Sequence, residues 1–480
     1  MKDFPEWVLK YKKKGVELRK IRGLYYMYEV SSSWDKDLKR PKKKTGVYLG
    51  RITEEKGFIA KKPSVAVSNK DSDMAKIHVK ERGVSEFIKN NFSEYEELLR
   101  SHFPDEWQSI LALVFGRFTE HSSMKNMKFH YEHSYLSELY PNARISKNKI
   151  TELLKKIGNN RFGIVEFFKN FNKEKDNIIF DGTDLTSNSK KMHFPKLSKT
   201  KKGGFDFVIN IMFIFSVKSQ LPIYYRNLQG SIKDMKSFKL SLLESGISDA
   251  TIILDKGFYS EENIKELESK KLNYLISLKR NNKLINYDAF ENNIKEKLDG
   301  YFLYEGRVIW YKSEDTEKGR VHIFMNEDLK TEESNDYIKR IDTHPEKYSI
   351  KLFHEKVKKF GTLAILENSI HSAEKSYHSY KTRNQVELMI DAFKNLIEAD
   401  HSYMQNDASL EGWMFINYVA LHWYYVILNK LKASKLNEKY SPNDIIKFLK
   451  EVKKVKLNNE WYDAEITKKT KDVLDKLGVN

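Results

Sequence analysis

The spacing of apolar residues changes near residue 175, and this change divides the chain. Before it, residues 110–118 and 150–157 place apolar side chains at helical spacing, which predicts amphipathic helices. After it come runs that are apolar on both faces, at residues 178–180, 205–217, 221–225, 251–254 and 273–278. Such runs predict buried strands, with helices at 231–245 and after Ser260. The pattern therefore predicts an α/β fold, a central sheet covered by helices.

Aromatic residues alternate along the first 60 positions and predict a β-rich region, with strands at residues 25–30, 47–52 and 58–60. A basic run lies between two of these strands, and we interpret it as a loop. A solvated hairpin loop and a phosphate-binding loop fit it equally well. On the second interpretation the DNA-binding residues are Lys39, Arg40, Lys42, Lys43 and Lys44.

The region that follows, residues 84–172, is predicted to be helical. One helix has Ser146 as its N-cap and Gly158 as its C-cap, with an apolar stripe between them and lysines around it. A small DNA-binding unit and an ordinary amphipathic helix packed on the core both remain open. Residues 301–304, 307–311 and 321–325 predict short strands, and from about residue 371 the chain is predicted to be helical to near its end. We therefore divide the chain at 1–70, 71–172, 173–280, 281–370 and 371–480.

Charge indicates the partner but does not identify it. The 480 residues carry a formal net charge of +18, which implies an acidic partner, either nucleic acid or an anionic membrane surface. The most apolar stretch, residues 413–428, contains Asn417 and His422 and is shorter than the roughly 20 residues that a membrane span needs. It is predicted to be a buried core helix.

Several chemistries are excluded by what the sequence lacks. It contains no cysteine, so disulfides, thiolate zinc sites and cysteine nucleophiles are absent. We find no H-E-x-x-H, P-loop or G-x-S-x-G motif. The N-terminus has no apolar segment typical of a secretory signal, and a cytoplasmic, nucleoid-associated location is expected.

Two aspartates come directly after predicted strands. Asp181 precedes Gly182 and Thr183, and Asp255 follows residues 251–254. Ligands of open α/β sheets bind at the carboxyl ends of strands, so both residues are candidates for a site. Either one alone is better explained as a turn residue.

A third group of residues favours a functional site over two unrelated turns. Tyr380, Arg383, Glu387 and Lys394 fall within about 60° of one another on a regular helix, so one face would carry a phenol, two cations and a carboxylate. A carboxylate between two cations is suited to remain ionised beside phosphate-binding groups. Apolar flanks would seat this helix on the sheet, namely Val386, Met389, Ile390 and Phe393.

The spacing Tyr380-x2-Arg383-x3-Glu387-x6-Lys394 resembles, without departure, the Y-x2-R-x3-E-x6-K signature of a large group of bacterial insertion-sequence transposases of the DDE type. Asp181-Gly182-Thr183 is similar to the first-aspartate motif of that group. Asp255 with the residues around it looks like the second motif. The resemblance covers about residues 175–430, including a β-rich segment before the glutamate helix.

The resemblance implies an RNase H-like core, a mixed five-stranded sheet flanked by helices. It implies that Asp181, Asp255 and Glu387 are catalytic and hold two Mg²⁺ ions, which Mn²⁺ can replace. By the same analogy Tyr380, Arg383 and Lys394 bind DNA phosphates, and a homodimer binds the two ends of a mobile element.

Some assignments stay open at this point. Asp184 is an alternative to Asp181 as a metal ligand, although Asp181 has the Gly-Thr context. Asp391 could support the site or be solvated. Trp310 is a DNA-binding candidate that could stack on an extruded base, but a core tryptophan is the safer interpretation. Three other functions compete: a DNA-binding protein without catalysis, a nuclease that does not transpose, and a basic protein of a membrane surface.

Overall fold

The computed structural model describes residues 4–35, 40–61, 77–200, 203–230, 234–399, 401–457 and 459–478. The chain forms two compact units, Met1–Lys76 and Ile77–Asn480, which are described separately. The finer division into five regions stays a prediction.

The N-terminal unit is an antiparallel four-stranded sheet with one short helix, α1 (Glu6–Leu9). Val8, Met27 and Ile52 form its small core. Its strands pair in the order of the chain: β1 (Val16–Ile21), β2 (Leu24–Asp35), β3 (Arg40–Thr53) and β4 (Gly57–Ala60).

Strands β2 and β3 extend beyond their neighbours as a two-stranded ribbon, paired from Val30 opposite Thr45 to Asp35 opposite Arg40. The interpretation of the basic run as a loop was therefore wrong for its second half, since Arg40 to Lys44 lie in β3. The residues of β2 that pair with these lysines are polar, for example Ser31 opposite Lys44, so the lysines lie in a strand and still face solvent. Lys39 lies outside the described residues.

The second unit is built around one ten-stranded sheet. Its centre is mixed: β6 is parallel to β10, which is parallel to β11, whereas β8 runs antiparallel to both β6 and β9. All five strands predicted from the apolar runs are present: β6 (Asp176–Thr186), β8 (Phe205–Ser216), β9 (Leu221–Gln229), β10 (Ala250–Leu254) and β11 (Asn273–Leu278).

The β-rich segment near residue 300 continues this sheet. The edge of the central strands, β11, pairs with β15, and β15 pairs with β14. Two helices in this segment, α11 (Glu327–Thr343) and α12 (Ile350–Lys356), were not predicted. The remaining strands of the sheet are β7 (Lys196–Lys199), β12 (Gly300–Tyr304), β13 (Arg307–Thr316), β14 (Gly319–Asn326) and β15 (Thr362–Glu367).

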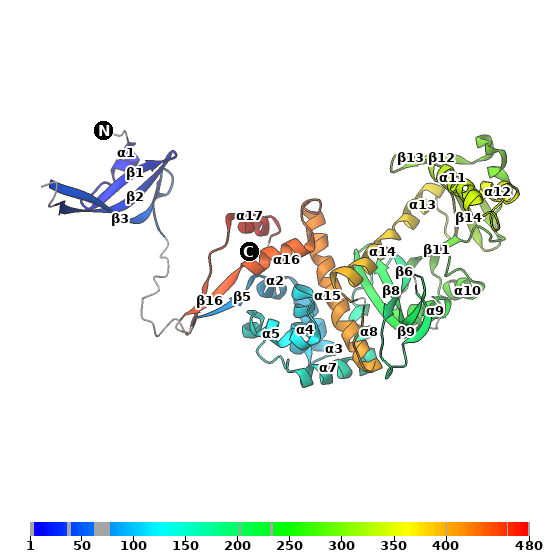
Figure 1. Ribbon diagram of the computed structural model, residues 1–480, viewed down its shortest axis with the longest axis horizontal. Helices are drawn as coiled ribbons and strands as arrows, with labels where there is room; N and C mark the ends of the chain where they lie inside the picture. The colour runs from blue at the N-terminus through cyan, green and yellow to red at the C-terminus, as the bar shows by residue number, and fades with distance from the viewer. Residues whose placement is uncertain are drawn as a thin grey trace. The chain divides into compact units, whose positions relative to one another are not determined.

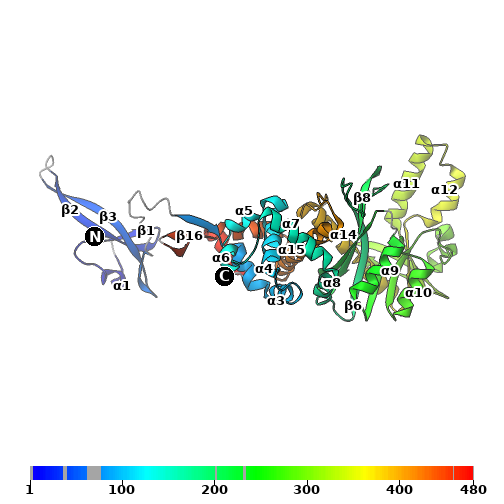
Figure 2. The ribbon, with the colours of Figure 1, turned by 90° about the horizontal axis from the view of Figure 1, so that it is seen from below.

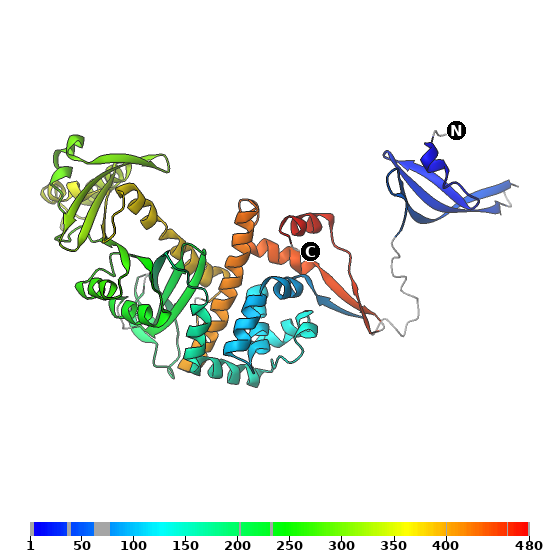
Figure 3. The same cartoon turned by 180° about the vertical axis from the view of Figure 1, so that it is seen from behind.

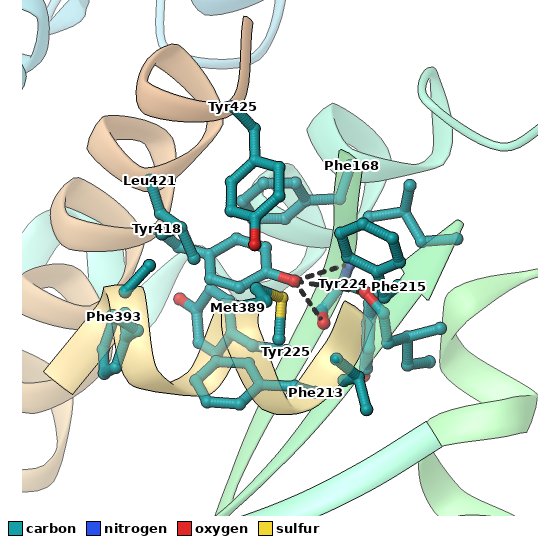
Figure 4. Packing of buried hydrophobic residues seen from close by; sticks show 14 of the residues in the cluster. Phe168, Phe213, Phe215, Tyr224, Tyr225, Met389, Phe393, Tyr418, Leu421 and Tyr425 are labelled. Carbon is teal, nitrogen blue, oxygen red and sulfur yellow. Dashed lines mark hydrogen bonds between the residues drawn. The ribbon is translucent and has the colours of Figure 1, made fainter. Parts of the chain in front are cut away.

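Helices cover both faces of the central strands (Figure 2). On one face Phe180 packs against Phe238, with ring centroids 4.9 Å apart. On the other, Phe213 packs against Phe393 and Tyr418 (Figure 4). The Tyr418 hydroxyl donates a hydrogen bond to the Tyr224 carbonyl oxygen at 2.7 Å, which ties helix to sheet. The covering helices are α9 (Asp234–Ser245) and α10 (Glu261–Ser269), then α14 (Asn384–Asp391) and α15 (Asp407–Ala433).

The helical region after residue 77 packs around α15, which is buried over most of its length, as predicted. Among the described residues, no helix combines the length and apolar character that crossing a bilayer requires. The helices of this region are α2 (Gly83–Asn91), α3 (Ser93–His102), α4 (Trp107–Glu120), α5 (Met127–Glu132), α6 (Leu136–Leu139), α7 (Lys147–Asn159) and α8 (Arg161–Lys169).

The end of the chain packs on this helical region rather than on the central sheet (Figure 3). Strand β16 pairs with β5 (His78–Glu81), so two segments about 375 residues apart share a small sheet. The prediction of a helical tail missed these strands. The tail consists of α16 (Pro442–Glu451), β16 (Lys453–Leu457), β17 (Glu460–Asp463) and α17 (Lys468–Lys476).

Gly158 has a different role from the one predicted. Ser146 caps α7 as expected, but the C-cap is Asn160, and Gly158 lies inside the helix. A Cβ atom on Gly158 would be 1.8 Å from the Ala408 carbonyl oxygen. The glycine therefore allows α7 to approach the start of α15 closely.

Candidate active site

The two aspartates lie side by side on neighbouring strands. In the parallel pair of β6 and β10, Ile179 is opposite Ile253. Two residues further along each strand are Asp181 and Asp255, on strands that are about 4.8 Å apart. Asp255 directly follows β10, as predicted, but Asp181 is inside β6 because β8 continues to pair there, with Phe213 opposite Asp181. The prediction that the first strand ends at Asp181 was wrong.

Hydrogen bonds orient both carboxylates. The Gly182 backbone N–H donates to Asp181 Oδ1 at 2.9 Å. The Ser277 hydroxyl of β11 donates to Asp255 Oδ1 at 3.2 Å. Three adjacent strands thus supply the base of the site.

The third element is broken rather than continuous. Helix α13 (Ala373–Lys381) ends before Arg383, α14 begins at Asn384, and a π-helical turn, η6 (Ala392–Leu396), follows. The prediction of one regular helix face was therefore wrong. The two helices bury side chains against different parts of the sheet: Tyr377 of α13 packs on Phe302 and Phe324, whereas α14 packs on β6 and β8 (Figure 1).

Apolar residues of α14 and η6 seat this segment on the sheet as predicted. Val386, Met389 and Phe393 are fully buried, and Ile390 is half-buried. Glu387, on the same helix, is 53% exposed, so its carboxylate faces outward from the packed side.

Arg383 joins the carboxylates. Its guanidinium lies 3.7 Å from Asp181 Oδ2 and donates to Glu387 Oε1 at 2.5 Å. Burial alone would lower the pKa of Arg383, but the groups around it outweigh burial and raise the pKa. These groups are Tyr380, Asp255, Asp181 and Glu387. All three predicted catalytic carboxylates therefore act electrostatically on one cation.

Tyr380 completes this cluster from the end of α13. Its side chain is 8% exposed. Burial raises the pKa of Tyr380, and the negative charge of Asp255 acts in the same direction, while Ser277 and Arg383 oppose them. The phenol therefore stays protonated at neutral pH and is a hydrogen-bond donor.

Lys394 does not flank Glu387 as expected. Its ammonium group pairs with Asp184 at 3.0 Å, from the π-helical turn. The structure thus separates the two candidate aspartates: Asp181 shares Arg383 with Glu387, and Asp184 contacts Lys394. This arrangement favours Asp181 as the partner of Asp255.

A cavity of about 770 Å³ opens beside Lys394 and was not predicted. Arg117 of α4 lines it and donates to Asn417 Oδ1 at 2.6 Å and to the carbonyl oxygen of Ile397, just after the π-helical turn. Burial lowers the pKa of Arg117 to about 10. One sequence signal was available, since Arg117 is a lone cation in an otherwise apolar helical run.

The remaining DNA-binding candidates lie outside this cluster. Arg40, Lys42, Lys43 and Lys44 are exposed on the ribbon of the N-terminal unit. Trp310 of β13 is half-buried, with its ring 5.2 Å from that of Tyr301 and beneath the ammonium group of Lys295.

The cluster has the chemistry of a cation site. Within the described residues, no three His, Asp or Glu side chains stand close enough together to hold a metal ion directly. The Arg383 guanidinium instead lies among the carboxylates that would do so. Carboxylate oxygens are the ligands that Mg²⁺ prefers, and this group already holds a positive charge, so the residues present fit a divalent cation.

One comparison with known proteins identifies a family. A family model described as a transposase DDE domain matches residues 172–423, about half of the chain. No curated protein matches the chain. A solved structure of the piggyBac transposase synaptic complex with hairpin DNA is similar at 13% identity and a TM-score of 0.37, over 72% of this chain and 70% of that one.

Proposed function

Since this chain belongs to the transposase DDE domain family, we propose that it cuts DNA at the ends of a mobile element and joins the freed strands to target DNA. The observation that carries this proposal is the convergence of Asp181, Asp255 and Glu387 on Arg383, inside the matched region. A basic chain of net charge +18 suits a polyanionic substrate.

We assign an RNase H-like core to residues of the central sheet. Support comes from the strand order β9-β8-β6-β10-β11, in which three parallel strands follow two antiparallel ones. In this fold the first aspartate lies on the central strand and the second at the end of its parallel neighbour, as Asp181 and Asp255 do here.

Asp181, Asp255 and Glu387 would hold two divalent ions, Mg²⁺ or its substitute Mn²⁺. Bound there, the ions supply the Lewis acidity and nucleophile activation that phosphodiester cleavage and strand transfer both need. The chain's own contribution is to place the three carboxylates beside Arg383. Arg383 is the group that keeps them together when no metal is bound.

The cationic and phenolic groups would bind the DNA backbone beside the cut. Arg383 has the planar fork that contacts phosphate through two hydrogen bonds, and Lys394 supplies a point charge. The protonated Tyr380 phenol donates to a phosphate oxygen without adding negative charge. On the N-terminal unit, Lys42 and its basic neighbours add contacts to other phosphates.

Two copies of the chain would act together, because transposition requires both ends of the element to be held at once. The alternative function is a nuclease or DNA-binding protein derived from a transposase. Strand joining distinguishes them: ends that already carry a free 3′-hydroxyl are incubated with a supercoiled target plasmid and Mg²⁺. Joined products support a transposase, whereas nicking or binding without joining supports the alternative.

A further inference from the structure

The N-terminal sheet has a second face that its core does not use. Side chains alternate along β2, so Tyr25 and Met27 point into the core with α1, and Tyr26 and Tyr28 point to the other side. In the described part of this unit, no helix packs on that side. We call it the outer face.

Three tyrosines form a cluster on the outer face. The Tyr48 ring lies 5.4 Å from Tyr28 and 6.0 Å from Tyr26, and all three side chains are half-buried. Arg19 stands over Tyr28, 5.0 Å from the ring centroid. Arg51, directly opposite Tyr26 in the ladder, is exposed. Aromatic rings and arginines thus occupy neighbouring positions on one surface.

The outer face continues onto the ribbon. Arg19 donates to the Thr45 hydroxyl at 2.6 Å, and Lys43 pairs with Glu17 at 2.7 Å, so both ribbon residues share the face of the tyrosines. Continued alternation along β2 brings Trp34 to this side, 65% exposed. From Tyr26 to Trp34 the surface is about 26 Å long, at roughly 3.3 Å per residue.

Charge identifies the class of ligand. Residues 1–61 contain 17 Lys and Arg against 8 Asp and Glu, a net charge of +9, which is half of the +18 of the chain in about an eighth of its length. Exposed aromatic rings interleaved with cations are typical of surfaces that stack bases and bind the phosphates between them.

The tyrosine cluster is suited to single strands rather than to a duplex. Arg51, opposite Tyr26, pairs with Ile59 of β4, so four strands spaced about 4.8 Å apart span about 14 Å there, more than the roughly 12 Å of a major groove. At Tyr28 and Tyr48 the sheet is three strands wide, about 10 Å between outer axes. The faces of paired bases are stacked on one another inside a duplex, whereas unpaired bases are free to stack on these rings.

We propose that the outer face binds single-stranded DNA, with bases stacked on the tyrosine cluster and Trp34 and phosphates held by Arg19, Arg51 and Lys43. The choice of DNA rests on the proposed function, because strand cutting and joining exposes unpaired ends. Burial raises the pKa of Tyr48, and Tyr26 and Tyr28 act in the same direction, so the Tyr48 phenol stays uncharged beside phosphates.

The test is binding by the full chain, in EDTA, of fluorescein-labelled oligo-dT about 15 nucleotides long and of a duplex of the same length. Trp34→Ala and Tyr48→Ala should each weaken oligo-dT binding about 5- to 150-fold, the range found for loss of one stacked base, and leave duplex binding within about twofold. Tyr48→Phe keeps the ring and should bind like wild type. The control is Tyr462→Ala, an exposed tyrosine of β17 in the second unit, which should change nothing.

Oligo-dT should also quench tryptophan emission of the wild type more than that of Trp34→Phe. Equal losses on single strands and duplex, or no loss in either alanine variant, would overturn the proposal and leave a surface that attracts DNA by charge alone. Since the Trp34 side chain is exposed, Trp34→Ala should fold like wild type, and a loss of binding in this variant would not be due to misfolding. The Glu387→Gln variant should still bind oligo-dT, so failure of the cleavage function and failure of this surface give different results.

Discussion

The hydrogen bonds around Glu367 allow a quantitative prediction about how firmly the helix that carries Tyr380 is held to the sheet. Glu367, at the end of β15, is fully buried. Its Oε1 lies 3.0 Å from His322 Nε2, and the Ser376 hydroxyl donates to its Oε2 at 2.8 Å. His322 is on β14 and Ser376 is on α13, so one carboxylate connects the continued sheet to the helix that carries Tyr380.

Replacing one partner should be costly because the other stays buried without its hydrogen bond. Leaving a buried hydrogen-bonding group without its partner destabilises proteins by about 1–3 kcal/mol. For a unit of about 400 residues, with an unfolding entropy near 2.1 cal/mol/K per residue, this corresponds to a fall in Tm of about 1–4 °C for Glu367→Leu or for His322→Leu.

The double variant should recover most of this loss, because two apolar side chains of similar volume need no partner. Thermal unfolding followed by circular dichroism measures all three variants. Single variants that melt at the same temperature as wild type, or a double variant that melts lower than either single one, would refute the reasoning. DNA cleavage by Glu367→Leu should fall as well, since α13 would no longer be held against the sheet.

Three further predictions concern pH, packing and the metal. Burial raises the pKa of Glu81 to about 7, so the stability that its protonated form contributes is complete below its ordinary pKa and is lost as pH rises through 7. Glu81→Gln should therefore be more stable than wild type at about pH 8, by up to roughly 3 kcal/mol. Equal melting temperatures of the two proteins at that pH would contradict this. A Cβ atom on Gly412 would be 2.1 Å from the Leu154 carbonyl oxygen, so Gly412→Ala should destabilise by about 1–3 kcal/mol in denaturant unfolding, and an unchanged midpoint would argue against that contact. Arg383→Gln frees the carboxylates from a competing cation, so Mn²⁺ should bind the protein without DNA several-fold more tightly by calorimetry; weaker binding would show that Arg383 does not compete.

Apolar runs predicted most of the central sheet, because burial on both faces leaves a clear pattern. Helix starts were also predictable where a side chain caps the backbone, as Ser146 and Ser260 do. The end of β6, the first strand of the central sheet in the chain, was not predictable. Asp181-Gly182 has the composition of a turn, and only pairing with β8, a segment distant in sequence, keeps it extended.

The candidate site was predictable by residue type and less so by geometry. The break before Arg383 arises because α13 and α14 pack on different parts of the sheet, which no local spacing records. The pairing of Lys394 with Asp184 depends on a π-helical turn, and regular helical angles cannot anticipate it. The role of Gly158 was not predictable for a similar reason. A glycine near a helix end suggests a C-cap, but Gly158 allows close packing between two helices that are far apart in the chain.

The most direct test of the account is cleavage of a labelled duplex that carries the terminal repeats flanking this gene, with Mg²⁺, by wild type and by Glu387→Gln. Glu374→Gln, an exposed carboxylate on α13, is the matched control. We expect wild type and the control to cut at the boundary of the element, and Glu387→Gln to bind the duplex without cutting it. Cleavage that survives Glu387→Gln, or wild type that binds and never cuts, would contradict the assignment of Asp181, Asp255 and Glu387 as the catalytic carboxylates.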